Sequence, residues 1–449
     1  MNVENLQCAD APSEAIFCKQ RGGDSGGVTM SHEWRTVKLV DISAKRRWAL
    51  NGGPFGSKLS RKHYSESGVP VIRGTNLSAD SKFSFDDFVY VSEEKADELR
   101  ANNAHPGDLI FTQRGTIGQV GLIPFDSPIS RFVISQSQMK LTVDPEQADA
   151  LFLYYFFSAV DTVQKIQNLA FAAGVPHINL DILRKFETPV PPLPVQRRIA
   201  GILSAYDELI ENSQRRIRIL EEMARSLYRE WFVHFLFPGH ENHPLVPSSL
   251  GDIPEGWEVK TLGDVAEVNR AQINGRSAPD EVHYIDISSV SPGQIDSITT
   301  YSFAEAPGRA RRVVRHGDVL WSCVRPNRRS YAQVMHPNPD TIVSTGFAVL
   351  TAKKVPFTYL YFATTTDDFV AYLTNHATGA AYPAVTAKTF EKAVMLIPHT
   401  ALLKMFGDTT ISIAEQIHTF QSQIQNLRFT RDLLLPRLLS GQVELTSND

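Results

Sequence analysis

Residues 199–231 read IAGILSAYDELIENSQRRIRILEEMARSLYREW, and seam positions recur through them at alternating steps of four and three. Residues 406–438 repeat this spacing. The seam positions are Ile199, Leu203, Tyr206, Ile210, Ser213, Ile217, Leu220, Ala224, Leu227 and Trp231, and then Phe406, Thr410, Ile413, Ile417, Phe420, Ile424, Leu427, Arg431, Leu434 and Leu438. An apolar period of 3.5 residues is typical of coiled-coil helices. Because neither helix can bury its seam alone, we expect the two to pair as an antiparallel coiled coil.

Three seam positions are polar. Ser213, Thr410 and Arg431 interrupt the apolar pattern. Single polar residues at seam positions often fix the register of a coiled coil. A gap filled by solvent, where the helices splay, is the alternative for each of them.

The chain also contains an internal duplication. Residues 34–42, WRTVKLVDI, resemble residues 257–265, WEVKTLGDV, and residues 106–111, PGDLIF, resemble residues 316–321, HGDVLW. These landmarks recur in one order at offsets of roughly 205–223 residues, which indicates two repeated modules. Each module contains short β-type runs bounded by turn residues, and one helix is expected in each, near 150–168 and 357–374. We therefore expect a mixed α/β (α+β) module with a curved sheet.

These patterns divide the chain into seven segments. Residues 1–30 form an extension that we expect to be disordered, or else Met30 is the true start. The other segments are a first module (31–193), a helical spacer (194–237), a linker (238–256), a second module (257–398), a second helical spacer (399–441) and a tail (442–449). Pro436 should kink or end the second spacer.

Composition and motif searches exclude several classes of function. No apolar run is long enough to span a bilayer, and the first ten residues lack signal-peptide character, so we expect a cytoplasmic protein. Three scattered cysteines exclude a disulfide framework, and no metal site is expected. The sequence lacks a phosphate-binding loop, a methyltransferase motif and a nucleophile elbow. We therefore predict a binding and scaffolding protein with no catalytic residues.

Basic residues gather in each module although the net charge is −4. Residues 45–62 contain six basic residues and no acidic one, and residues 309–329 contain seven arginines and one aspartate. Solvated surface is one explanation for such clusters, and a footprint for a polyanion is the other. Arg73 with Asn76, and Arg114 with Gln113, pair a cation with an amide of the kind that reads base edges. The candidate DNA contacts are Lys45, Arg46, Arg47, Lys58, Arg61, Lys62, Arg73, Asn76, Gln113, Arg114, Arg309, Arg311, Arg312, Arg315, Arg325, Arg328 and Arg329.

Taken in order, several phrases resemble the specificity subunits of Type I restriction–modification systems. The most telling are residues 191–200, PPLPVQRRIA, with residues 220–235, LEEMARSLYREWFVHF, and the closing phrase 435–441, LPRLLSG. Residues 53–57, 71–76, 174–179 and 379–383 are similar to landmarks of the family's target-recognition domains. The second spacer departs from the pattern, because residues 398–403 lack the proline-rich start of the first.

The resemblance implies that two target-recognition domains read a bipartite site on double-stranded DNA, with the helices as the spacer. The family's partners are two modification subunits, which methylate adenine with S-adenosylmethionine, and two ATP-dependent restriction subunits. S-adenosylmethionine, ATP and magnesium are therefore expected on the partners, and this chain is expected to bind no cofactor. The alternatives are the DNA-recognition subunit of a methylation-only or phage-defence system, and a protein scaffold that does not bind DNA.

Overall fold

The computed structural model describes residues 34–77, 81–172, 177–274 and 278–443. The expected extension over residues 1–30 lies outside the described residues. The chain forms two compact units that divide between Ala200 and Gly201. No helix among the described residues has the length and apolarity that crossing a bilayer requires.

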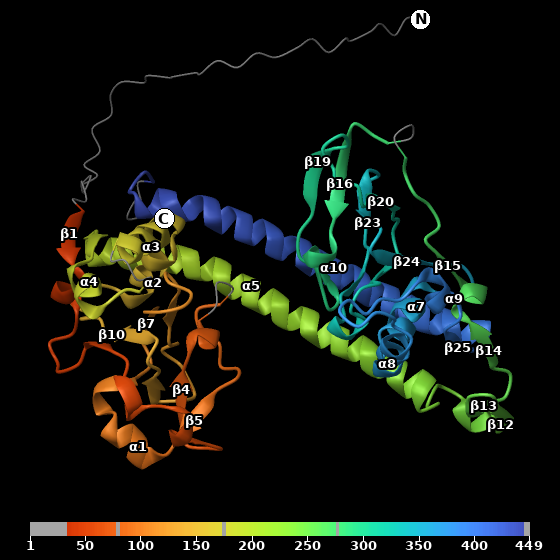
Figure 1. Ribbon diagram of the computed structural model, residues 1–449, viewed down its shortest axis with the longest axis horizontal. Helices are drawn as coiled ribbons and strands as arrows, with labels where there is room; N and C mark the ends of the chain where they lie inside the picture. Colours follow the sequence, from red (N-terminus) through yellow and green to blue (C-terminus); the bar gives the residue numbers. More distant parts are fainter. Residues whose placement is uncertain (1–33, 78–80, 173–176, 275–277, 444–449) are drawn as a thin grey trace, which may run out of the picture. The chain divides into compact units, whose positions relative to one another are not determined.

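The first unit contains one edge pair and two sheets (Figure 1). Strand β1 (Arg35–Lys38) pairs with β11 (Glu187–Val190). The first sheet has the order β2 (Leu50–Gly52), β10 (Gln138–Leu141), β7 (Leu109–Thr112) and β8 (Val120–Leu122), and is antiparallel throughout. The second sheet has the order β3 (Tyr64–Ser65), β5 (Val89–Val91), β4 (Val69–Ile72), β9 (Phe132–Ile134) and β6 (Asn103–Ala104), and only β4 and β9 are parallel. Helix α1 (Glu93–Glu98) follows β5.

The second unit repeats this topology, which confirms the predicted duplication. Strand β14 (Glu258–Thr261) pairs with β25 (Val394–Ile397), as β1 pairs with β11. The sheet β15 (Ala266–Val268), β24 (Phe347–Ala352), β21 (Val319–Ser322), β22 (Tyr331–Gln333) matches the first sheet of unit one. The sheet β19 (Thr299–Ser302), β16 (Glu281–Ile285), β23 (Thr341–Ser344), β20 (Ala310–Val313) matches β5-β4-β9-β6, including the single parallel pair, β16 with β23. Two small hairpins, β12 (Leu245–Ser248) with β13 (Gly251–Pro254) and β17 (Val290–Ser291) with β18 (Gln294–Ile295), complete the unit.

The modules have the expected mixed α/β fold, with more elements than the sequence indicated. Each module divides its strands between two sheets and an edge pair. Each also has two helices where we expected one: α2 (Ala150–Ser158) with α3 (Val160–Ala172), and α7 (Phe357–Thr364) with α8 (Asp367–Asn375). The extended backbone of Ala159 separates α2 from α3. Thr366 separates α7 from α8, because its hydroxyl accepts the backbone N–H of Phe369 and caps α8. Short helices α4 (Leu180–Lys185) and α9 (Ala387–Glu391) follow.

The two predicted spacers form long helices. Helix α5 spans Leu193–Tyr228 and continues as a π-helical turn, Arg229–Val233, and helix α10 spans Thr400–Leu439. Pro436 lies inside α10, so the helix does not end there. His399 takes the place of the missing proline-rich start, because its Nδ1 accepts the backbone N–H of Leu402 at 3.2 Å and caps α10.

Within the second unit α5 and α10 run side by side in opposite directions (Figure 1). Asp207 contacts Arg431, Arg216 lies over Phe420, and Tyr228 packs on Phe406, so residue numbers rise along one helix as they fall along the other. All the seam positions named above are buried or half-buried.

None of the three polar seam residues lacks a partner. The Ser213 hydroxyl donates to the carbonyl of Leu209 at 2.8 Å, and that of Thr410 donates to Thr358 at 2.7 Å. Arg431 donates to Asp207. Of these three contacts, that of Arg431 with Asp207 joins the two helices and can fix their register, whereas Ser213 bonds within α5 and Thr410 bonds to α7.

The far ends of this helical pair belong to the core of the second module. Phe232 lies against Phe406 and Tyr359, with ring centres 4.9 and 5.0 Å apart. Phe406 and Trp321 are fully buried in the same apolar cluster. Packing of this density fixes the direction in which the helices leave the module.

Candidate nucleic-acid interface

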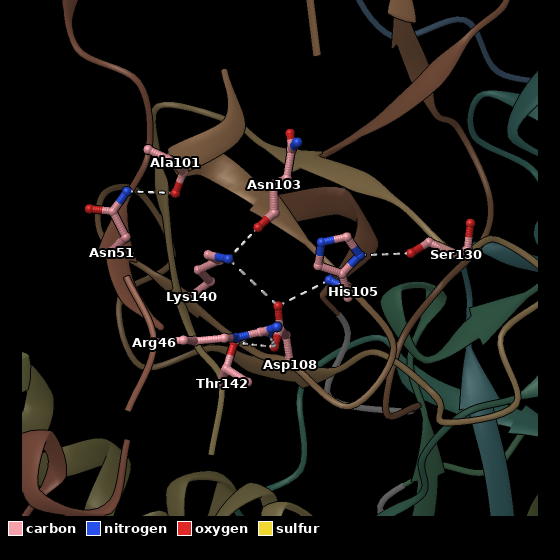
Figure 2. Close-up of polar contacts among 9 residues, drawn as sticks. All are labelled: Arg46, Asn51, Ala101, Asn103, His105, Asp108, Ser130, Lys140 and Thr142. Atoms are coloured by element: carbon pink, nitrogen blue, oxygen red, sulfur yellow. Dashed lines mark hydrogen bonds and ion pairs between the residues drawn. The ribbon is translucent and has the colours of Figure 1, made fainter. Parts of the chain in front are cut away.

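A buried aspartate anchors the central strand of the first module. Asp108 precedes β7, and its Oδ2 accepts the backbone N–H of His105 at 3.0 Å (Figure 2). Its Oδ1 accepts the hydroxyl of Thr142 at 2.6 Å. Lys140 is buried nearby, 3.8 Å from Asp108, and donates to the carbonyl of Asn103. Burial lowers the pKa of Lys140, and the charge of Asp108 opposes this effect.

Arg46, a predicted DNA contact, also belongs to this network. Its Nη2 donates to the Thr142 hydroxyl at 3.0 Å and lies 4.0 Å from Asp108. More than half of the side chain is nevertheless exposed, at 55%. Arg46 therefore has an internal partner while part of its guanidinium stays accessible.

Asp318 is the equivalent residue of the second module. Its Oδ2 accepts the backbone N–H of Arg315 at 2.9 Å, and its Oδ1 accepts the hydroxyl of Thr351 at 2.7 Å. Burial raises the pKa of Asp318, while these hydrogen bonds and the nearby Arg315 oppose the shift. The Gly-Asp phrase seen in the sequence is thus a turn that anchors the central strand of each module, and the loop that leaves this strand starts from a rigid base.

Those two loops are held by a later part of the chain in the same way. After β7, the carbonyl of Gln113 accepts the backbone N–H of Ile178 at 3.1 Å. After β21, the carbonyl of Cys323 accepts the backbone N–H of Val385 at 2.9 Å, and Arg325 donates its N–H to the carbonyl of Pro383 at 2.8 Å. In each module, a loop that carries predicted DNA contacts is therefore joined to the segment before α4 or α9.

The loop after β21 holds two arginines in a strained conformation. Arg325 and Arg329 have φ values of 50° and 57°, in the left-handed region that non-glycine residues rarely adopt. Each such residue costs about 1–3 kcal/mol and tends to occur at functional sites. The Arg325 guanidinium lies over the ring of Tyr382, 4.8 Å from its centre, and Tyr382 is 69% exposed. A cation and an aromatic ring are thus presented together at the surface, while Arg329 pairs with Asp367.

A basic loop of the first module is also held by a later part of the chain. A Cβ at Gly53 would lie 2.1 Å from the carbonyl oxygen of Ser135, so only glycine fits against this turn. The amide of Gln136 donates to the carbonyls of Gly56 and Leu59 at 2.5 and 2.6 Å. These contacts hold the segment that contains Phe55, which is 82% exposed. Its exposed basic residues are Lys58, Arg61 and Lys62.

The predicted contacts divide into free and engaged side chains. Lys45, Lys58, Arg61, Lys62, Arg114 and Arg328 are exposed, and none forms an ion pair or side-chain hydrogen bond with other described residues. Arg47 lies over Trp48 and Arg311 over Phe303, with the guanidinium 4.4 and 4.8 Å from the ring centre. Arg315 contacts Asp318 at 3.8 Å, and the charge of Arg309 acts on Asp286.

The structure places three of the predicted contacts in hydrogen bonds within the fold. Asn76 is fully buried and caps its own turn, accepting the N–H of Arg73 at 2.9 Å. The guanidinium of half-buried Arg73 donates to the carbonyl of Asp87. Arg312 donates to Asn269 and to the carbonyl of Phe347. The amide side chain of Asn76 and these two guanidinium groups are therefore already engaged within the fold.

Phe55 and Tyr382 are two further candidate contacts, which the sequence alone did not single out. Both lie in phrases that were identified as landmarks, 53–57 and 379–383, and an aromatic residue between small or turn-forming residues was the available signal. Their exposure depends on the later chain segments described above.

A sequence profile described as the Type I restriction modification DNA specificity domain matches residues 31–222 and 254–425. The chain belongs to this family. The two matches each contain one module and much of the long helix that follows it, so the family repeat coincides with the structural duplication. Members of this family are specificity subunits, which are the non-catalytic components of restriction–modification complexes.

Relatives of this specificity subunit align over nearly its whole length. The Type I restriction enzyme MjaIX specificity subunit of Methanocaldococcus jannaschii is 22% identical over 92% of this chain and 94% of its own. The HindI specificity subunit of Haemophilus influenzae is also 22% identical, over 92% of this chain and 100% of its own. The crystal structure of the S subunit from M. genitalium superimposes with a TM-score of 0.58 at 16% identity, and covers 92% of this chain and 97% of that one. This likeness supports the fold.

Proposed function

We propose that this specificity subunit reads a bipartite site on double-stranded DNA, with one half-site for each module. The observation that carries the proposal is the repeated topology, in which equivalent loops follow β7 and β21. Because the loops differ in sequence, the two half-sites should differ as well. Free lysines and arginines would neutralise phosphates, and a few side chains would read base edges.

The second module supplies the most specific candidate reader. Half-buried Arg325 lies over the exposed ring of Tyr382, and its Nη2 also donates to the carbonyl of Ala381 at 3.3 Å. A guanidinium that donates two hydrogen bonds to guanine is the commonest base contact in DNA recognition. In the first module, Arg114 follows the equivalent strand and has a free guanidinium.

The helical pair would hold the partner subunits. Apolar side chains remain exposed on both helices: Leu209, Ile219 and Met223 on α5, and Met405, Phe429 and Leu433 on α10. Such residues are candidates for a protein interface, because exposed apolar side chains that gather into a patch favour association. We propose two modification and two restriction subunits as partners. S-adenosylmethionine, ATP and magnesium would be bound by them.

Mapping of adenine methylation across the genome of a host that expresses this chain with its modification subunits tests the proposal. The expected result is a split motif with a gap of constant length. Replacement of residues 257–398 by the corresponding module of a relative should change one half of the motif and leave the other unchanged. An unsplit motif, or a change in both halves, would contradict the assignment of one half-site to each module.

A further inference from the structure

Three side chains that no sequence motif connects meet beside α10 in the second module. His316 belongs to the turn before β21, His336 follows β22, and Glu415 lies on α10. The Nε2 of His336 lies 2.7 Å from one carboxylate oxygen of Glu415, and the Nε2 of His316 lies 3.9 Å from the other. One nitrogen or oxygen from each residue lies within 4.8 Å of the others.

We propose that His316, His336 and Glu415 bind a divalent transition-metal ion such as Zn²⁺, with His418 or water at a further position. Imidazole nitrogens with one carboxylate oxygen form a common ligand set for zinc, at about 2.0–2.2 Å from the ion. Ligand atoms within 4.8 Å of one another converge on such an ion after small side-chain movements.

His418 strengthens the cluster. It follows Glu415 by three residues on α10, so both side chains project from the same face of the helix. Its ring centre lies 5.2 Å from that of His336. Its imidazole can offer a ring nitrogen as a further ligand.

The backbone of His336 gives an independent reason to expect a function here. Its φ is 44°, in the left-handed region, and the residue is not glycine. The conformation persists only where surrounding structure holds it. It places the ring of His336 between His316 and His418, with ring centres 4.5 and 5.2 Å away.

One contact opposes metal binding and limits its strength. The Nδ1 of His316 accepts the backbone N–H of His336 at 3.3 Å, so the neutral ring carries its proton on Nε2. Coordination of a neutral ring through Nε2 requires the other tautomer, with the proton moved to Nδ1, so the long contact between Nδ1 and the His336 N–H is lost. The side chains of His316 and His336 are also 38% and 53% exposed. We therefore expect weaker binding than at a closed structural zinc site, with water completing the coordination.

A bound ion would join the second spacer helix to its module. The ligands come from both sides of this contact, where the described residues also include apolar packing and the Thr358–Thr410 hydrogen bond. The site would therefore stabilise the orientation of the second module on its helix, independently of whether DNA is bound.

Titration of the full-length, chelator-treated chain with Zn²⁺, and with Co²⁺ followed by visible absorption, tests this proposal. One ion should bind per chain at this cluster, and thermal stability should rise when the ion is added. The variants His336→Ala and Glu415→Gln should each lose affinity more than about tenfold. His376→Ala is the matched control, because that exposed histidine contacts only the carbonyl and ring of Tyr372 and should bind metal normally.

The conservative variant guards against a folding artefact. Glu415→Gln should retain the circular dichroism spectrum and metal-free unfolding midpoint of the parent chain while it loses the stabilisation by Zn²⁺. Metal binding that is equal in the parent, His336→Ala and Glu415→Gln would overturn the proposal, as would a parent chain that binds neither ion.

Discussion

The Nη1 of Arg431 lies 2.7 Å from Oδ1 of Asp207, and this ion pair joins the two spacer helices across a seam that is otherwise largely apolar. The side chains are 23% and 10% exposed. Burial works against the charge of Arg431, but the hydrogen bond and charge of Asp207 raise its pKa above the usual value. A shift of either helix by one turn would separate the pair, so the contact specifies the register.

Asp207→Ala should destabilise the helical pair, because it removes the partner of half-buried Arg431 on the facing helix and leaves Arg431 with exposed Asp432 on its own helix. Removal of one member of a fully buried pair costs about 3–5 kcal/mol, and we expect about 2 kcal/mol at this partly exposed pair. Urea unfolding measures the change. The double variant Asp207→Leu, Arg431→Leu should recover most of the stability. Equal losses for the single and double variants would show that the pair itself contributes nothing.

Leu203→Asp should separate the helices, since it places a carboxylate at a fully buried seam position. Loss of the apolar contacts and burial of a charge both disfavour the folded state. The matched control is Leu209→Asp on the same helix, where the side chain is 55% exposed and stability should change by less than about 0.5 kcal/mol. Thermal unfolding followed by circular dichroism compares the stability of the two variants. Equal effects would place Leu203 outside the seam.

Arg325→Ala and Tyr382→Ala should each weaken binding to the DNA half-site of the second module and leave the first unaffected. Loss of a good base contact costs about 1–3 kcal/mol of discrimination. Arg328→Ala is the comparison. Loss of a phosphate contact weakens binding to all sequences and lowers the salt dependence by about one unit of slope. Binding to duplexes altered in one half at a time measures both effects. A uniform loss for Arg325→Ala would assign it to phosphate.

Replacement of Lys58, Arg61 and Lys62 by glutamate should reduce affinity for all duplexes and flatten its salt dependence. Each lost phosphate contact changes the slope of log affinity against log salt by about 0.9. The fold should be unaffected, because all three side chains are exposed without a partner among the described residues. Arg312→Glu, by contrast, should destabilise the second module itself. Unchanged salt dependence in the triple variant would remove this loop from the interface.

Cys323 should react slowly with iodoacetamide in the native protein. Burial raises the pKa of its thiol to about 11, whereas a free cysteine titrates near 8.5. Because the thiolate is the reactive form, the rate should rise about tenfold for each pH unit up to the raised pKa. Peptide mass spectrometry after labelling at several pH values gives the rate at this site alone. A native rate that levels off near pH 8.5 would show that the thiol is accessible.

Much of this architecture follows from local patterns. The 3.5-residue period over 199–231 and 406–438 predicted two long helices, and the repeated phrases predicted two duplicated modules. Such signals survive in a single sequence because helical periodicity and turn chemistry depend on residues close together in the chain. At Ala159 and Thr366, one backbone conformation and one hydroxyl cap divide each expected helix in two.

The candidate sites depended on tertiary structure. Composition alone grouped Arg312 with Arg328. The guanidinium of Arg312 donates to Asn269 and to a carbonyl, whereas that of Arg328 is exposed without a partner among the described residues. Arg325 meets Tyr382, and His336 meets Glu415, only because strands far apart in sequence pair and place their loops together. The sequence by itself determined the repeat, the helices and their seam, while tertiary structure decided which polar side chains remain free, because that depends on long-range contacts that no local pattern records.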